Sequence, residues 1–259
     1  MSIARRTTAV SASLLAVLAG VGPAVAAGGP AVVDAPLDTV SGPGISAHRT
    51  APHGRILNST SSNWSGYAAT GSTFNSVSAS WVEPTGNCSS TDTYSSFWVG
   101  LDGDGSNSVE QTGTEVDCSG GSPQYYSWYE MYPSAPVNFS DTVEPGDHFN
   151  ASVTYNGNGA FTLVLSDTTR GWSHTVNKTL SNPSLASAEV IAEAPSDSSG
   201  PLPLTDFGTV NFTNAEANGQ AIGTYNPDNI TMASGGTTLA TASSLSNGTD
   251  FSDTWKASS

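Results

Sequence analysis

The stretch from Ala151 to Leu165 reads Ala-Ser-Val-Thr-Tyr-Asn-Gly-Asn-Gly-Ala-Phe-Thr-Leu-Val-Leu. Apolar side chains recur at every second position on both sides of the central Asn-Gly-Asn-Gly. A period of two places one face of a strand against a core. Asn-Gly pairs accept the positive φ angles that tight hairpin turns require. The stretch therefore predicts a β-hairpin with one buried face.

Short apolar runs separated by Gly, Pro, Asn and Ser continue along the chain from Asn63, and no amphipathic helical stripe of about ten residues interrupts them. Besides the hairpin, we expect strands at 64–69, 76–82, 95–101, 108–114, 125–132, 175–180, 188–192, 207–213 and 222–225. Many short strands without helices indicate an all-β fold, an antiparallel β-sandwich of two packed sheets.

Charge in the 259 residues is lopsided, with 7 Lys and Arg against 22 Asp and Glu and a net charge of −15. Only Arg170, Lys178 and Lys256 follow residue 55. Nucleic-acid binding needs basic side chains that replace counterions, and attraction to anionic lipid needs them too. We therefore expect neither nucleic acid nor a membrane as a partner. Low pH suits such a chain, because protonating carboxylates relieves their mutual repulsion.

The N-terminus has the features of a secretory signal peptide over residues 1–26. Arg5 and Arg6 precede an apolar run that is too short to span a bilayer, and Ala24-Val25-Ala26 fits the small-x-small cleavage rule. Residues 27–57 are rich in Gly, Pro and Ala and are interpreted as a pro-segment or flexible leader. Residues 58–259 are then expected to form the β-sandwich domain of a secreted, extracellular protein.

Two cysteines in an exported chain, Cys88 and Cys118, predict a single disulfide. Together with His148 and His174 they lack the short spacing of a zinc site, so we expect neither a metal nor another cofactor. Asp102-Gly103-Asp104-Gly105-Ser106 is reminiscent of a calcium loop, but the Gly and Glu that an EF-hand loop requires later are missing.

Several predicted strands carry one face on which an aromatic or amide side chain alternates with an acid. These pairs are Trp98 with Asp102, Gln111 with Glu115, and Trp128 with Glu130; on a fourth strand Glu189 and Glu193 share a face with Ile191. A solvated strand face would favour Thr, Ser and Lys instead. An aromatic and acidic face is typical of the floor of a binding cleft.

The available chemistry is that of carboxylates. A Gly-x-Ser-x-Gly elbow is absent, and the two histidines of the body are interpreted as surface residues. A glycosidase using Glu130 and Glu193 is one alternative, although Glu115-Val116-Asp117 is followed by Cys118-Ser119 and so lacks the third acid of a common glucanase signature. A carbohydrate-binding sandwich module is another.

The chain resembles the glutamic peptidases (eqolisins), a family of acid endopeptidases with a β-sandwich fold. The resemblance runs from Asn63-Trp64-Ser65-Gly66 to about Asn214. It is carried by Trp98-Val99-Gly100-Leu101-Asp102-Gly103-Asp104, Glu110-Gln111-Thr112-Gly113, Trp128-Tyr129-Glu130-Met131-Tyr132-Pro133, Glu144-Pro145-Gly146-Asp147, Ala188-Glu189-Val190-Ile191-Ala192-Glu193 and Asp206-Phe207-Gly208-Thr209-Val210. Family members usually have an acid after the last glutamate of the strand, where this chain has Ala194.

The resemblance implies two curved, concanavalin-like sheets and a catalytic dyad of Gln111 and Glu193. Glu189 is the competitor for the glutamate, four positions away on the same face, and motif position alone favours Glu193. The residues expected to line the cleft and bind substrate are Trp64, Trp98, Asp102, Glu115, Trp128 and Glu130. Polypeptides are the partners we expect, and the protein is expected to act as a monomer.

Overall fold

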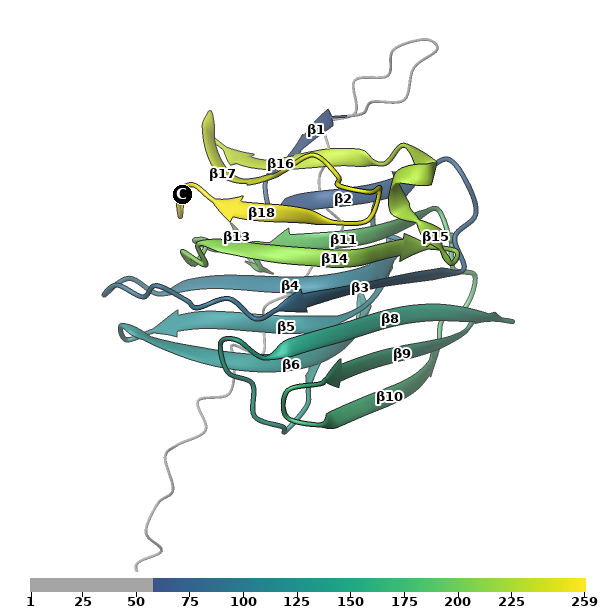
Figure 1. Cartoon of the computed structure of the whole chain (residues 1–259), viewed down its shortest axis with the longest axis horizontal. Coiled ribbons are helices and arrows are strands. Elements are labelled where there is room, and N and C mark those ends of the chain that lie inside the picture. The colour runs from purple at the N-terminus through teal and green to yellow at the C-terminus, as the bar shows by residue number, and fades with distance from the viewer. Residues whose placement is uncertain (1–57) are drawn as a thin grey trace, which may run out of the picture. The chain divides into compact units, whose positions relative to one another are not determined.

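Hydrogen bonding joins most strands into one long sheet in the computed structural model, which describes residues 58–259 (Figure 1). The signal peptide expected at 1–26 and the leader expected at 27–57 lie outside the described residues. Among the described residues the only helical element is a short 3-10 turn, η1. The prediction of an all-β fold is therefore confirmed.

The elements follow the chain in this order: β1 (Asn58–Ser61), β2 (Trp64–Thr70), β3 (Ser76–Val82), β4 (Thr93–Leu101), β5 (Val109–Ser119), β6 (Ser122–Tyr132), β7 (Val137–Asn138), β8 (His148–Gly157), β9 (Ala160–Asp167), β10 (Trp172–Thr179), β11 (Ser187–Glu193), β12 (Ser196–Asp197), β13 (Gly200–Pro201), β14 (Thr209–Ala217), β15 (Gln220–Ala221), η1 (Ile222–Tyr225), β16 (Asp228–Ser234), β17 (Thr237–Ala242) and β18 (Phe251–Trp255).

The long sheet doubles back on itself to make a sandwich. Its strand order is β10-β9-β8-β3-β14-β18-β17-β16-β2-β11-β4-β5-β6-β7. Strands β4, β5 and β11 pack against β8, β9, β3 and β14. The two leaves of the expected sandwich are thus joined along one edge through β16, β17 and β18, as Figure 1 shows.

The hairpin predicted from Ala151–Leu165 is confirmed as β8 and β9. Its turn holds Asn158 at φ 54° and Gly159 at φ 77°. Gly157 pairs with Ala160 beside it. Two successive positive φ angles match the right-handed twist of the strands, which explains the Asn-Gly pair.

Strand β4 shows how the leaf that carries the site separates two environments. Phe97, Val99 and Leu101 lie in the core between the leaves, whereas Trp98 belongs to a second apolar cluster. That second cluster also contains Trp64, Ala68, Val109, Trp128, Ile191 and Ile230. The leaf therefore buries apolar side chains on both faces, as the near-continuous burial of β2, β5 and β11 indicates.

Two sequence expectations need correction in the C-terminal part. The strand expected at 222–225 is the 3-10 turn η1, in which Ile222 is buried and Asn226 ends the turn in the left-handed region. The expected strands end at residue 225, yet the chain beyond it forms β16, β17 and β18, which close the sandwich. Small Ser, Thr and Ala side chains dominate these strands and weaken their alternation.

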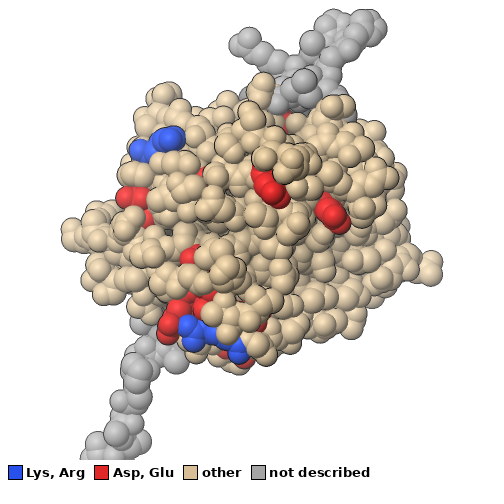
Figure 2. All heavy atoms as spheres, in the orientation of Figure 1, with Lys and Arg blue, Asp and Glu red and all other residues tan. Residues whose placement is uncertain are grey.

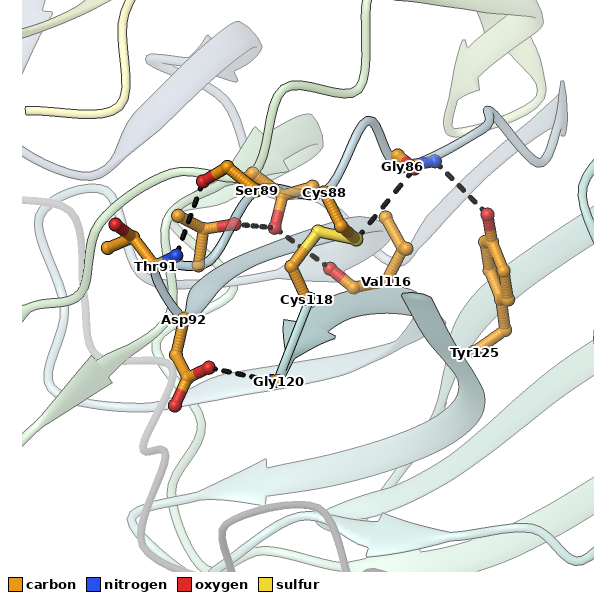
Figure 3. Close-up of a disulfide and its surroundings, with 11 residues drawn as sticks. Gly86, Cys88, Ser89, Thr91, Asp92, Val116, Cys118, Gly120 and Tyr125 are labelled. Carbon is orange, nitrogen blue, oxygen red and sulfur yellow. Dashed lines mark hydrogen bonds between the residues drawn. A yellow bond between two sulfur atoms is a disulfide. The ribbon is translucent and has the colours of Figure 1, made fainter. Parts of the chain in front are cut away.

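The expected disulfide between Cys88 and Cys118 is present (Figure 3). It ties the loop before β4 to the end of β5. The same loop is held by the Tyr125 hydroxyl, which accepts from Gly86 N–H at 3.1 Å, and by Asp92, which accepts from Gly120 N–H at 3.0 Å. The loop is therefore fixed to the strand that carries Gln111 and Glu115.

The molecular surface drawn in Figure 2 carries few charged side chains, and acidic ones outnumber basic ones. Arg170 forms ion pairs with Glu144 and Asp147. No helix within residues 58–259 has the length and apolar character needed to cross a bilayer.

Candidate active site

Five neighbouring strands bring most of the predicted site residues to one face of one leaf. Strand β2 supplies Trp64, β4 supplies Trp98, β5 supplies Gln111 and Glu115, β6 supplies Trp128 and Glu130, and β11 supplies Glu193. All seven side chains are buried. The period-two argument that placed acids among aromatics on these strands therefore holds for this group.

A glycine sets the spacing across the face. Gly113 lies directly opposite Trp98 on β4 and Trp128 on β6. A Cβ at this position would lie 2.2 Å from the Phe97 carbonyl oxygen and 2.6 Å from the Trp98 Cβ. The absence of a side chain lets the Trp98 side chain lie against the backbone of β5.

The carboxylate of Glu193 is held by N–H groups from two sides. The Trp98 indole Nε1 donates to Oε2 at 2.7 Å, and the Asn63 amide Nδ2 donates to Oε1 at 3.1 Å. Burial raises the pKa of Glu193 to about 8, while the N–H groups of Trp98, Trp64 and Asn63 favour the charged form and oppose that rise. Glu193 is thus a positioned carboxyl with a strongly perturbed pKa.

The indole rings of Trp64 and Trp98 meet edge to face beside this carboxyl, with ring centres 5.0 Å apart and planes at 75°. The Trp64 Nε1 has no hydrogen-bond partner among the described residues. The Trp64 N–H group still favours the charged form of Glu193, although it makes no hydrogen bond with that carboxyl. Two large rings exclude water there, which strengthens each remaining polar contact.

Gln111 is tied to Glu130 on the adjacent strand. Its Nε2 donates to Glu130 Oε2 at 2.5 Å. Burial, with smaller contributions from the charges of Glu193 and Glu115, raises the pKa of Glu130 to about 9, although the Gln111 hydrogen bond opposes the rise. Gln111 Oε1 and Glu130 Oε1 are both buried without a hydrogen-bond partner in the described chain. Unpaired buried oxygens of this kind are costly, and a bound water or substrate group would satisfy them.

Glu115 adds a third acid to the group. Burial raises the pKa of both Glu115 and its neighbour Asp117. The charge of Glu115 acts on Glu193 and on Glu130. The electrostatic interactions therefore join Glu115, Glu130 and Glu193 into one set, with Gln111 attached through its hydrogen bond.

Asp102 has a different environment from the one expected. Its carboxylate accepts three backbone N–H groups, from Ser184, Leu185 and Ala186, at 2.7–3.1 Å. Its backbone adopts φ 67° just after β4 ends, so the alternation of the strand no longer fixes its direction. Both oxygens of Asp102 are used to hold the loop before β11, and this placement gives no support to a role in the cleft.

The competitor Glu189 forms a second acidic group with Asp102 and Asp104, whose charges act on it. Burial raises the pKa of Glu189 well above its ordinary value, and Asp104 and Asp102 add to the effect. Strand register sets Gln111 level with Glu189 across Gly100, and Glu193 level with Glu115 across Ser96. Register therefore does not separate the two glutamates, whereas their side-chain environments differ.

Asn63 and Ser61 are residues that the strand pattern did not single out. Asn63 lies between β1 and β2, outside any alternation, although it opens the Asn63–Gly66 piece of the resemblance. The Ser61 hydroxyl donates to Asn63 Oδ1 at 3.1 Å and accepts from the backbone N–H groups of Asn63 and Trp64.

Raised carboxyl pKa values are not confined to the site. Burial is the first cause in every case, and the affected residues are Glu83, Glu110, Glu115, Asp117, Glu130, Glu189, Glu193 and Asp253. Among residues 58–259, no cluster of three or more His, Cys, Asp or Glu side chains is arranged to hold a metal ion. The site offers acids, amides and indoles as its working groups.

Comparisons with known proteins show which family the chain resembles. The sequence profile of the peptidase A4 family matches residues 62–255. Aspergillopepsin-2 of Aspergillus niger is 33% identical over 122 residues, which is 45% of this chain and 43% of that protein. The chain thus spans less than half the length of this curated relative.

Solved structures resemble the fold over more of the chain. Scytalido-glutamic peptidase with a transition state analog inhibitor matches at a TM-score of 0.63 and 28% identity, covering 75% of this chain and 98% of that one. SCP-B, an eqolisin in complex with the tripeptide Ala-Ile-His, matches at 0.59 and 27%, with the same coverage. Aspergilloglutamic peptidase of Aspergillus niger matches at 0.56 and 26%, covering 63% of this chain and 99% of that one.

The resemblance to glutamic peptidases in the sequence is thereby confirmed, and the β-sandwich is the fold of these relatives. The profile match extends over most of the described residues, including every strand that carries the site. The chain belongs to the peptidase A4 family, the glutamic peptidases.

Proposed function

We propose that the protein is a secreted acid endopeptidase that hydrolyses polypeptides through Gln111 and Glu193. The observation that carries the proposal is the buried Glu193 carboxyl, which Trp98 and Asn63 hold by N–H donors on both oxygens. Membership of a glutamic peptidase family supports peptide hydrolysis as the reaction.

The two side chains divide the chemistry between them. Over one cycle Glu193 accepts one proton from the water whose oxygen attacks the peptide carbonyl carbon and donates one proton to the departing nitrogen, so it ends in the protonation state in which it began. An amide has two N–H donors, and Gln111 uses one on Glu130. The other N–H is available to the oxyanion that develops on the peptide carbonyl, and the Gln111 amide stays neutral at any working pH.

Acid conditions fit the rest of the site. Burial raises the pKa of Glu130 to about 9 and that of Glu193 to about 8, and the charge of Glu115 contributes to both, so protons remain on this group throughout the acid range. Ionisation of several of these acids at higher pH would place like charges together on one buried face. The active form is therefore the acid form.

Secretion is part of the proposal. It is supported by the basic and apolar N-terminus with Ala24-Val25-Ala26, and by the disulfide between Cys88 and Cys118. N-terminal sequencing of protein collected from the medium, before and after acid incubation, tests both the export and the removal of residues 27–57. A terminus still at Ala27 in fully active protein would contradict removal of the leader.

The activity is tested by incubating the processed protein with denatured casein between pH 2 and pH 7. Cleavage in the acid range is expected, and it should be lost in Glu193→Gln. Release of sugar from β-glucans, or glycan binding without any proteolysis, would instead favour the carbohydrate alternatives. No cleavage of casein at any pH would remove the enzyme proposal.

A further inference from the structure

We propose that Asn63, fixed in place by Ser61, is a positioning residue that orients Glu193 and sets the pH range in which it works. The inference rests on the proposed function and names a part of the site beyond the Gln111 and Glu193 pair. Asn63 acts through Glu193, so substrate contact is not part of its role.

Two separate contacts join Asn63 to the end of β11. The side-chain amide donates to Glu193 Oε1 at 3.1 Å, and the backbone carbonyl accepts from Ala194 N–H at 2.8 Å. One contact fixes the carboxyl and the other fixes the backbone that carries it. Asn63 and Glu193 are both buried, with exposed fractions of 4% and 0%. Solvent therefore does not compete strongly for these contacts.

Ser61 decides which way the Asn63 amide faces. Its hydroxyl donates to Asn63 Oδ1 at 3.1 Å, and the oxygen of that hydroxyl accepts two backbone N–H groups. Because the amide oxygen is engaged on the Ser61 side, the Nδ2 donor is turned toward Glu193. A rotated amide would present an acceptor to a carboxylate, which is unfavourable.

The electrostatic consequence has a definite direction. The acids that face Glu193 are Glu115 from β5 and Glu130 from β6, and burial together with Glu115 raises its pKa. The Asn63 donor lowers that pKa. Removing the donor therefore raises it, and any activity limb that follows Glu193 moves to higher pH. This direction is the same whether Glu193 begins the cycle as base or as acid.

The first test uses Asn63→Leu, which keeps much of the volume and removes the donor. The limb of kcat/KM governed by Glu193 should move up by about one pH unit, since hydrogen bonds to charged groups are among the stronger ones. We expect kcat to fall roughly tenfold and KM to change little, because the lost contact is to Glu193. Ser61→Ala should give a smaller shift in the same direction.

The matched control is Ser59→Ala. Ser59 is a buried residue of β1, the strand that also carries Ser61, and its hydroxyl has no hydrogen-bond partner among the described residues. The pH profile of Ser59→Ala should coincide with that of the wild type. An unmoved limb in Asn63→Leu, with or without a loss of rate, would overturn the proposal, because a merely structural role changes rate without moving the profile.

A second variant and a second measurement keep the proposal testable if Asn63→Leu does not fold or if no suitable substrate is found. Asn63→Asp keeps the shape and sets a second carboxyl beside Glu193, so the pair should titrate in two separated steps. The titration of Glu193 is followed by NMR of protein with carbon-13-labelled glutamate, assigned by the signal missing in Glu193→Gln. Wild-type protein that cleaves nothing would end the proposed function, whereas equal titration of Glu193 in wild type and both Asn63 variants would end this inference alone.

Discussion

Gln111 and Glu130 face each other across neighbouring strands, and the Gln111 amide nitrogen lies 2.5 Å from a Glu130 carboxylate oxygen. The hydrogen bond orients the amide, because the Nε2 end must point toward Glu130. It also sets a neutral donor next to an acid that already repels Glu193 and Glu115. A neutral amide is thus the group this position requires.

Gln111→Glu should inactivate the enzyme, because a further carboxylate beside Glu130 raises a pKa within the group and removes the N–H donors. Gln111→Ala should lower kcat by ~10²–10³-fold if the amide stabilises the oxyanion. Rates of peptide cleavage at the acid optimum provide the measurement. Gln220→Glu, at an exposed amide on β15, is the matched control and should behave as wild type. Full activity of Gln111→Glu would show that the amide has no catalytic part.

Glu193→Gln should reduce cleavage by ~10²–10⁴-fold while the fold survives, since it keeps the shape and removes the carboxyl that takes up and gives up the proton. Glu189→Gln should keep most activity, because the charges that act on Glu189 are those of Asp104 and Asp102 and not those of the Glu115, Glu130 and Glu193 group. Thermal melts of both variants establish that folding is retained. If Glu189→Gln abolished cleavage and Glu193→Gln spared it, the catalytic glutamate would have to be reassigned.

Stability should be greatest in acid and decline as the pH rises. Burial raises the pKa values of Glu83, Glu110 and Glu193 from 4.5 to about 8. At pH values between these two, the folded state therefore binds more protons than the unfolded chain. The stabilisation is complete below the unfolded value and is lost progressively up to about pH 8. Melting temperatures between pH 3 and pH 9 test this. A melting temperature that rises from pH 4 to pH 8 would contradict it.

Replacing both cysteines, as Cys88→Ser with Cys118→Ser, should lower the free energy of unfolding by ~3–4 kcal/mol, from the loop entropy of a 30-residue separation. For a domain of this size that corresponds to a melting temperature lower by roughly 10 °C. A reducing agent should lower the melting temperature of the wild type and leave that of the double variant unchanged. Equal melting of the two oxidised proteins would show that the bridge contributes nothing.

The sequence was most informative where local chemistry decides the structure. Asn158 and Gly159 adopt the positive φ angles of a tight turn whatever surrounds them, so the hairpin of β8 and β9 was predictable. Strands β16 and β18 were not, because few of their residues are apolar. They form by pairing with β2 and β14, which lie far away in the chain.

The site residues likewise fall into those that the strand pattern predicted and those that it did not. Period two correctly grouped Trp98, Trp128 and Glu130 on one face, since each lies inside a regular strand. It fixes no direction for Asp102, where a positive φ turns the chain out of the strand, and it did not reach Asn63 in the turn between two strands. The roles of Gln111 and Glu193 came from the family resemblance, because alternation alone does not tell one buried acid from another.

The eight carboxyls with raised pKa values have a consequence for calorimetry. Seven of them, all but Glu189, have pKa values of about 7 or higher, so they keep their protons in the folded protein at about pH 6 and give them up once they reach water, and unfolding at that pH releases several protons to the buffer. The heat absorbed on unfolding then includes the heat with which the buffer takes up those protons. Scans in phosphate and in imidazole, matched in pH and melting temperature, should therefore give different unfolding enthalpies, and the difference counts the protons released.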